Sequence, residues 1–143
     1  MASSYEDQEL RRHRALRGSG VDGRFSRKFL DSAQLGVSRW RYEPGKQTRG
    51  HRHEIQEEVY TVISGSGRIK LDDEIIEIKQ WDVIRVAPRV ACGFEAGPEG
   101  LEIIAAGGSK PDGGDGELVE GALAGRVVAR RSGYTATTMM NAA

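Results

Sequence analysis

The chain of 143 residues has the size of one ordinary domain, and its 21 basic and 21 acidic residues give a formal net charge of zero. This balance disfavours a general nucleic-acid or anionic-membrane binder, which needs a basic excess. The single cysteine excludes an intrachain disulfide and a cysteine-rich zinc module, and the three histidines limit an all-histidine metal site to three ligands. Because no apolar run approaches the ~18 residues of a membrane span and the amino terminus is polar, we expect a cytoplasmic protein with no nucleic-acid and no membrane partner.

The amino-terminal residues 1–25 are mostly polar and are expected to form a partly flexible arm. Basic residues predominate between Arg11 and Lys28. They either form a site for an anionic partner or are simply solvated. His13 lies in this arm and is not expected to bind a metal.

The middle of the chain predicts a series of short strands. Alternating or β-branched segments, separated by turn residues, occupy residues 35–44, 58–64, 67–71, 74–79, 82–88, 92–96 and 100–107. No long segment has a period of 3.6 residues. This pattern predicts an all-β barrel or sandwich over residues 26–107.

The carboxyl-terminal residues 108–143 are expected to form a glycine-rich linker and an extension. The segment 107–117 contains five glycines and one proline, which is typical of a loop. Residues 125–131 are rich in valine and arginine and could add an edge strand.

Histidines and glutamates in the segment 45–65 carry the candidate chemistry. His51 and His53 are two residues apart, so on a strand both imidazoles point to the same face. Glu57 and Glu58 open the next predicted strand, where only one of two neighbours can face inward. Two imidazoles and one carboxylate supply three ligands for a divalent ion and leave positions for water or substrate. The alternative is a surface histidine pair beside solvated acids.

The same segment resembles the first motif of the cupin superfamily, which has a glycine, a His-x-His pair, a glutamate and a second glycine at fixed spacing. The matching residues are Gly45, His51, His53, Glu58 and Gly65. The resemblance extends roughly over residues 30–107 and implies a double-stranded β-helix, or jelly-roll barrel, of the cupin type. It also implies a metal site at the two histidines and the matching glutamate, and a homodimer.

The second cupin motif aligns without a gap to residues 81–96, but its signature residues are replaced. Its glycine, proline, glycine, histidine and asparagine positions are occupied by Trp81, Ala87, Arg89, Cys92 and Ala96. Cys92 therefore stands where the family has a metal-binding histidine. It is either a fourth ligand or a small buried residue, which is how a free cysteine usually behaves.

The expected cofactor is a divalent metal ion, with Fe, Zn, Mn, Ni and Cu as candidates. A Cys92 thiolate would favour zinc, copper or iron over manganese. Without it, His51, His53 and Glu58 form a two-histidine, one-carboxylate set that suits non-haem Fe(II). A weakly held metal or a vacant site is the third alternative.

Four further side chains are candidates for substrate binding, and no catalytic residue is assigned. Trp40, Tyr60 and Phe94 are aromatic and either contact a ligand or pack in the core. Arg85 lies in an apolar run, where a charge needs a partner or an inward polar role. Facing the metal, its guanidinium would hold a substrate carboxylate; the alternative is an outward-facing arginine.

The sequence therefore favours two hypotheses about function. The first is a metal-dependent enzyme, a dioxygenase or isomerase, that acts on a small polar or anionic organic molecule. The second is a non-catalytic small-molecule binding or sensing barrel with weak or no metal. The replaced second motif supports the latter, and the fold alone does not decide between them.

Overall fold

The structure, a computed structural model, describes residues 15–18, 20–119 and 126–127 and contains only strands and turns in these ranges. It confirms the all-β class predicted from the sequence. No helix that could span a membrane occurs in this described part of the chain. The strands are β1 (Ala15–Gly18), β2 (Val21–Phe25), β3 (Gly36–Tyr42), β4 (Gly50–His53), β5 (Glu58–Leu71), β6 (Glu74–Lys79), β7 (Val83–Val86), β8 (Cys92–Gly107), β9 (Gly116–Val119) and β10 (Arg126–Val127).

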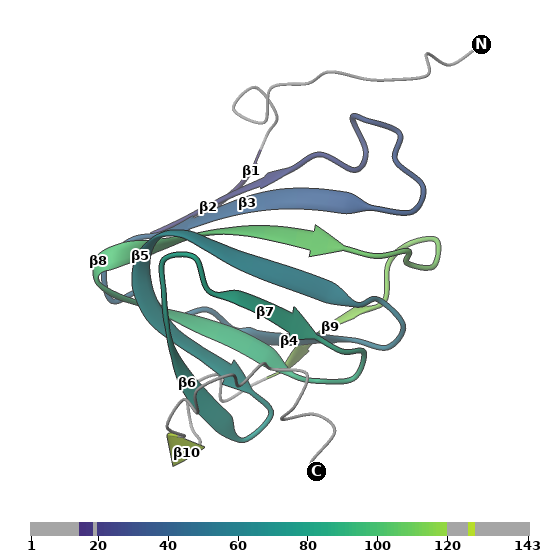
Figure 1. The fold of residues 1–143 in the computed structure, drawn as a ribbon. Coiled ribbons are helices and arrows are strands. Elements are labelled where there is room, and N and C mark those ends of the chain that lie inside the picture. Colours follow the sequence, from purple (N-terminus) through teal and green to yellow (C-terminus); the bar gives the residue numbers. More distant parts are fainter. Residues whose placement is uncertain (1–14, 19, 120–125, 128–143) are drawn as a thin grey trace.

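The strands form one curled sheet (Figure 1). Its main hydrogen-bonded order is β1-β2-β3-β8-β5-β6-β10, while β4 pairs with β8 and β9, and β7 pairs with β5. The two long strands, β5 and β8, pair with each other along both of their halves. The first half of β5 also pairs with β7 and the second half with β6, so β5 contributes to both sides of the curled sheet. This arrangement is the jelly-roll barrel that the resemblance implied.

A sharp bend at Gly65 allows β5 to change sides. Gly65 has a φ of 76°, and a Cβ atom built on it would lie 2.1 Å from the backbone oxygen of Gly100. The pairing of β5 with β8 shifts register on both sides of this position. The sequence predicted two separate strands, 58–64 and 67–71, and the structure corrects this to one bent strand. The glycine that was interpreted as a strand end is a bend, because only glycine tolerates both the positive φ and the close contact.

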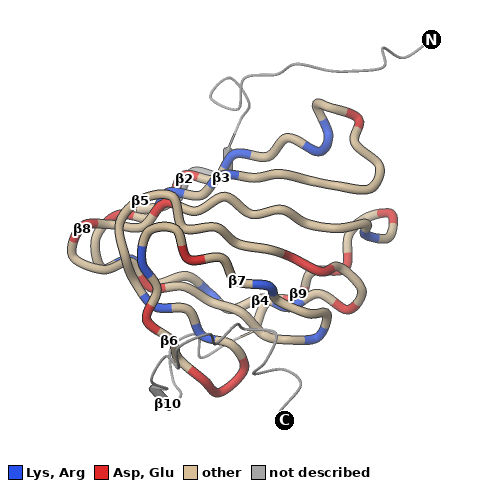
Figure 2. Tube along the Cα trace, in the orientation of Figure 1, with Lys and Arg blue, Asp and Glu red and all other residues tan. Residues whose placement is uncertain are grey.

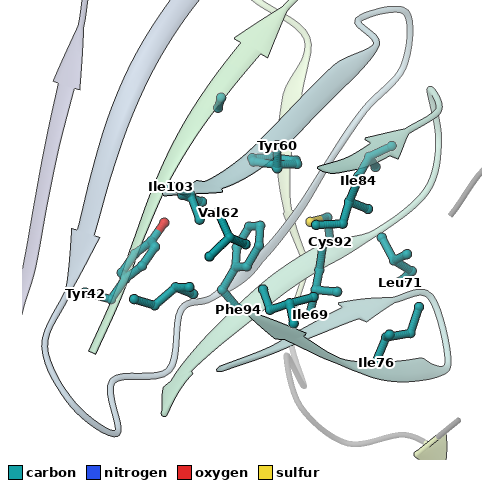
Figure 3. Packing of buried hydrophobic residues seen from close by; sticks show 14 of the residues in the cluster. Tyr42, Tyr60, Val62, Ile69, Leu71, Ile76, Ile84, Cys92, Phe94 and Ile103 are labelled. Atoms are coloured by element: carbon teal, nitrogen blue, oxygen red, sulfur yellow. The ribbon is translucent and has the colours of Figure 1, made fainter. Parts of the chain in front are cut away.

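The core lies inside the curl of the sheet. Val62, Ile69 and Ile103 have no exposed surface, and they pack with the aromatic and aliphatic side chains shown in Figure 3. These residues come from alternate positions of β5 and β8, as expected for strands with one buried face. Basic and acidic residues are interspersed along the trace (Figure 2).

Strands also occur on both sides of the predicted barrel range 26–107. β1 and β2 pair with each other and extend the sheet from β3, within the segment predicted as an arm. After the barrel, β9 pairs with β4, and β10 runs parallel to β6. Part of the predicted edge strand 125–131 is therefore present as β10. His13 lies outside the described residues.

Candidate metal site

β4 presents His51 and His53 on the same side of the sheet. The strand is held on both edges, because His51 pairs with Cys92 of β8 and all of β4 pairs with β9. The carbonyl oxygen of His53 also accepts a 2.6 Å hydrogen bond from the backbone N–H of Arg89. The two imidazole rings lie 5.3 Å apart between centroids, at an angle of 80°. Their positions are therefore set by the backbone on either side of them.

Glu58 brings a carboxylate between the two imidazoles. Its Oε2 lies 3.2 Å from Nε2 of His51, and its Oε1 lies 3.5 Å from Nε2 of His53. One ligand atom from each of the three residues lies within 4.8 Å of the others, which is a geometry that could hold a metal ion. The exposed fractions of the side chains of His51, His53 and Glu58 are 31%, 18% and 16%, so the cluster is sheltered but open to solvent.

Tyr60 closes the cluster on its inner side. It lies two residues after Glu58 on the same face of β5 and is 3% exposed. Its hydroxyl donates a hydrogen bond to Oε2 of Glu58 and lies 3.2 Å from Nε2 of His51. The tyrosine therefore orients the carboxylate from the side of the core.

His53 lies between two carboxylates. Its Nδ1 is 2.9 Å from Oδ1 of Asp115, and its Nε2 faces Glu58 on the other side of the ring. A neutral imidazole that donates from Nδ1 presents the lone pair of Nε2 to a carboxylate, and a cation between the two atoms makes this arrangement favourable. The donor set thus fits a divalent ion on chemical grounds.

The ionisation of the cluster follows from its contacts. Burial acts to raise the pKa of Glu58, but the hydrogen bonds from His51, His53 and Tyr60 outweigh it and hold that pKa below its ordinary value. The hydrogen bond to Glu58 raises the pKa of His53, against the opposing effect of burial. In the metal-free protein an anionic carboxylate therefore faces the imidazoles.

Cys92 lies beside the cluster rather than in it. Its side chain is 2% exposed and packs in the core near Tyr60 and Phe94 (Figure 3), outside the group of mutually close ligand atoms. Burial raises the pKa of the Cys92 thiol, so the neutral thiol is favoured. This placement agrees with the packing alternative for this residue.

The aromatic candidates form a row that runs from the surface to the cluster. Trp40 stacks on Tyr42 at 6.2 Å, Tyr42 stacks on Phe94 at 6.2 Å, and Phe94 contacts the ring of Tyr60 edge-on at 5.0 Å. Of these rings, Tyr60 alone is hydrogen-bonded to the ligand cluster. Phe94 supports Tyr60 from behind, and Trp40 lies two stacking contacts further away.

Arg85 is not brought to the cluster. Its Nε donates a 2.6 Å hydrogen bond to Glu57, and the side chains of the two residues are 39% and 48% exposed. Arg85 pairs with Val59 in the sheet, so it lies on the face opposite to Glu58 and Tyr60. Arg85 therefore faces outward, which is the second alternative considered from the sequence. The alternation of side chains along β5 also explains why Glu58, rather than its neighbour Glu57, faces His51.

Asp115 contacts the candidate site and was not expected there from the sequence. It belongs to the glycine-rich segment expected to form a linker, and 62 positions separate it from His53. Its side chain is 7% exposed and also accepts hydrogen bonds from the backbone N–H groups of Ile55 and Gln56, at 2.6 and 3.0 Å. The only local signal is an acidic residue among glycines, which by itself is typical of a turn.

Comparison with known proteins identifies the barrel. Residues 38–106 match the family model described as the cupin domain. Solved structures with the same fold include oxalate decarboxylase from Bacillus subtilis, with a TM-score of 0.71 and 18% identity over 83% of this chain and 33% of that one. KdgF from a Halomonas species has a TM-score of 0.62 and 15% identity over 79% of this chain and 98% of that one. The barrel therefore has the jelly-roll fold of these cupin proteins, and residues 38–106 match a cupin domain.

The relatives differ in how much of their own length is matched. An uncharacterized protein of Methanocaldococcus jannaschii is 38% identical over 45 residues, or 32% of this chain and 36% of that protein. The chain thus spans about a third of the length of this relative and of the oxalate decarboxylases. The Bacillus subtilis oxalate decarboxylase contains Mn(II) centres. At these identities the solved structures establish the fold alone.

Proposed function

We propose that this cupin barrel binds a divalent metal ion through His51, His53 and Glu58 and acts on a small polar or anionic organic molecule. The observation that carries the proposal is the convergence of three ligand atoms within 4.8 Å of one another at a sheltered but open position. Two imidazoles and one carboxylate leave coordination positions for substrate. The alternative of unconnected surface groups does not account for a carboxylate held between two imidazoles by a buried tyrosine.

A bound divalent ion would supply Lewis acidity toward a carbonyl, carboxylate or enediol oxygen, or a position for O2, as an isomerase or a dioxygenase requires. The chain itself would orient the ligands. Tyr60 holds one oxygen of Glu58, which leaves the other oxygen toward His53. Because Arg85 is paired on the outer face, an anionic substrate would be attracted by the metal rather than by this arginine.

The types of ligand atom at the site limit which metal ions can bind there, but several ions satisfy them. Two imidazole nitrogens and one carboxylate oxygen suit Mn, Fe, Ni, Cu and Zn, and a buried neutral thiol at Cys92 adds no preference for a soft metal. The Mn(II) centres of the oxalate decarboxylase with this fold support manganese as one candidate. The name of that enzyme also supports a small carboxylate as one class of substrate.

The test is the metal content of tag-free protein, measured by mass spectrometry after reconstitution with each candidate ion. We expect close to one ion per chain for the wild type and none for the double variant His51→Ala/His53→Ala. Arg52→Ala is the matched control, because this residue lies between the histidines and pairs with the exposed Glu117. A wild type without stoichiometric metal would rule out the metalloenzyme.

The second candidate is a non-catalytic binding or sensing barrel. It is supported by Cys92, which is buried and lies where the cupin pattern has a further metal-binding histidine. This function predicts that the double histidine variant binds small organic acids as well as the wild type does, in a calorimetric titration with oxalate and formate as probes. Loss of binding together with the metal would instead support the first candidate.

The proposal includes a homodimer in the cytoplasm, as the resemblance to single-domain cupins implies. Sedimentation velocity of the purified chain should give about twice its mass of 15.6 kDa. The mass of a single chain at micromolar concentration would contradict the dimer.

A further inference from the structure

The glycine-rich segment after β8 places one carboxylate against His53. Gly116 is the sheet partner of His53, and a Cβ atom built on Gly116 would lie 3.3 Å from Cε1 of that ring. The absence of a side chain at this position lets the segment approach the imidazole closely. The preceding residue, Asp115, then reaches Nδ1 of His53 at 2.9 Å.

The carboxylate of Asp115 is itself held in place. Its Oδ2 accepts hydrogen bonds from the backbone N–H groups of Ile55 and Gln56, so its Oδ1 remains for the histidine. The side chain is 7% exposed, which limits competition from water. Three hydrogen bonds thus connect the carboxyl-terminal segment to β4 and to the turn that follows it.

This geometry determines which nitrogen of His53 carries the proton. An ionised carboxylate only accepts hydrogen bonds, and Asp115, 2.9 Å from Nδ1, is a closer acceptor than Glu58, 3.5 Å from Nε2, so a neutral His53 donates from Nδ1. The lone pair of the neutral ring then lies on Nε2, the atom that faces Glu58. A histidine binds a metal through an unprotonated nitrogen, and the partner of the other ring nitrogen selects it.

We infer that Asp115 is a positioning residue that fixes the tautomer and orientation of His53, so that the carboxyl-terminal segment completes the metal site. The inference rests on the proposed metal binding, because it assigns Nε2 of His53 as the ligand atom. It predicts that the site needs more of the chain than the barrel strands that resemble the cupin motifs.

The variant Asp115→Asn tests this inference sharply. The two backbone N–H groups require an acceptor, so the amide oxygen takes the place of Oδ2 and the amide NH2 group faces Nδ1 of His53. An NH2 group donates, so it favours the tautomer with the proton on Nε2 and blocks the ligand lone pair. The matched control is Asp112→Asn, an exposed position in the same segment.

The first measurement uses the metal-free protein. The 15N chemical shifts of the ring nitrogens, recorded at a pH where both rings are neutral, should show Nδ1–H for His53 in the wild type and in Asp112→Asn. They should show Nε2–H in Asp115→Asn, with the shifts of His51 unchanged as an internal check on folding. The same tautomer of His53 in all three proteins would overturn the inference.

The second measurement is the affinity for Mn(II) and Zn(II). We expect Asp115→Asn to weaken both by about 10- to 100-fold and Asp112→Asn to leave both unchanged. Equal affinities of the wild type and Asp115→Asn would overturn the positioning role. The two proposals fail separately, because a wild type that binds no metal refutes the proposed function while the ring-nitrogen shifts still report whether Asp115 selects the tautomer.

Discussion

Two segments of the barrel, Gly45–Gly65 and Trp81–Ala96, differ in the residues that occupy their left-handed turns. In the first segment the positive φ angles of 73° and 76° belong to Gly45 and Gly65. In the second segment, angles of 71° and 69° belong to Trp81 and Arg89, where the cupin pattern has glycine. The backbone conformation therefore persists after the glycines have been replaced.

The hydrogen bonds around these turns explain the persistence. The backbone N–H of Trp81 donates to Val62 at 2.7 Å, and that of Arg89 donates to His53 at 2.6 Å. These bonds connect the second segment to β5 and β4, so the turns remain although a non-glycine residue in this region costs about 1–2 kcal/mol. The second segment thus supports β4 and β5 through its backbone, while none of its side chains belongs to the group of mutually close ligand atoms among the described residues.

The largest expected effect is a loss of stability on substitution of Gly65, which should exceed the loss on substitution of Gly45, the other glycine of the first segment. Gly65→Ala places a Cβ atom 2.1 Å from the backbone oxygen of Gly100, whereas a Cβ at Gly45 meets nothing within 4 Å. We expect Gly65→Ala to lower the free energy of unfolding by at least about 3 kcal/mol, and Gly45→Ala by about 1–2 kcal/mol. Urea denaturation measures both. Equal losses would contradict the close contact at the bend.

Cys92 tests whether the second segment retains any metal chemistry. Cys92→Ser places a hydroxyl in the core and should lower the free energy of unfolding by about 1–3 kcal/mol, without a change in metal stoichiometry. The Co(II)-substituted wild type should show no thiolate charge-transfer band. A band in the wild type that disappears in the variant would show that Cys92 is a fourth ligand. Both segments would then supply metal ligands.

Glycine at the two strained turns of the second segment should stabilise the protein. Trp81 and Arg89 have side chains that are largely exposed, so their removal sacrifices little packing. We expect Trp81→Gly and Arg89→Gly each to raise the free energy of unfolding by about 0.5–1 kcal/mol, because relief of strain exceeds the added entropy of the unfolded chain. The corresponding alanine variants keep the Cβ atom and should not stabilise. A gain with alanine as large as with glycine would refute strain as the cause.

The smallest effect is expected for Arg85. Its pairing with Glu57 is exposed, so Arg85→Gln should change the free energy of unfolding by no more than about 0.5 kcal/mol. Metal affinity should be unchanged, because the arginine lies on the outer face of the sheet. Turnover or ligand binding that falls tenfold in this variant would instead restore the substrate-binding role considered from the sequence.

Features that depend on short-range interactions could be predicted from the sequence, whereas features that depend on long-range contacts could not. Most strands of the barrel range and the shared face of His51 and His53 could be predicted, because alternation along a strand is a local property. The strands β1, β2 and β9 could not, because they lie in segments whose polar or glycine-rich composition is typical of an arm or a linker. The continuity of β5 through Gly65 could not, since a glycine that ends a strand and one that bends it look alike in sequence. The pairing of Arg85 with Glu57 could not be predicted either, because an arginine in an apolar run can lie on the inner or the outer face of the sheet.

The sequence by itself determined the all-β class, the cupin resemblance and a set of candidate ligands, because each depends on residue type and short spacing. Only the tertiary structure decided that Glu58 lies between the imidazoles with Tyr60 behind it, and that Cys92 packs beside the cluster. It alone brought Asp115 to His53 across 62 positions. Such contacts depend on the register of β9 against β4 and on the close approach that Gly116 allows, and no local pattern encodes either of them.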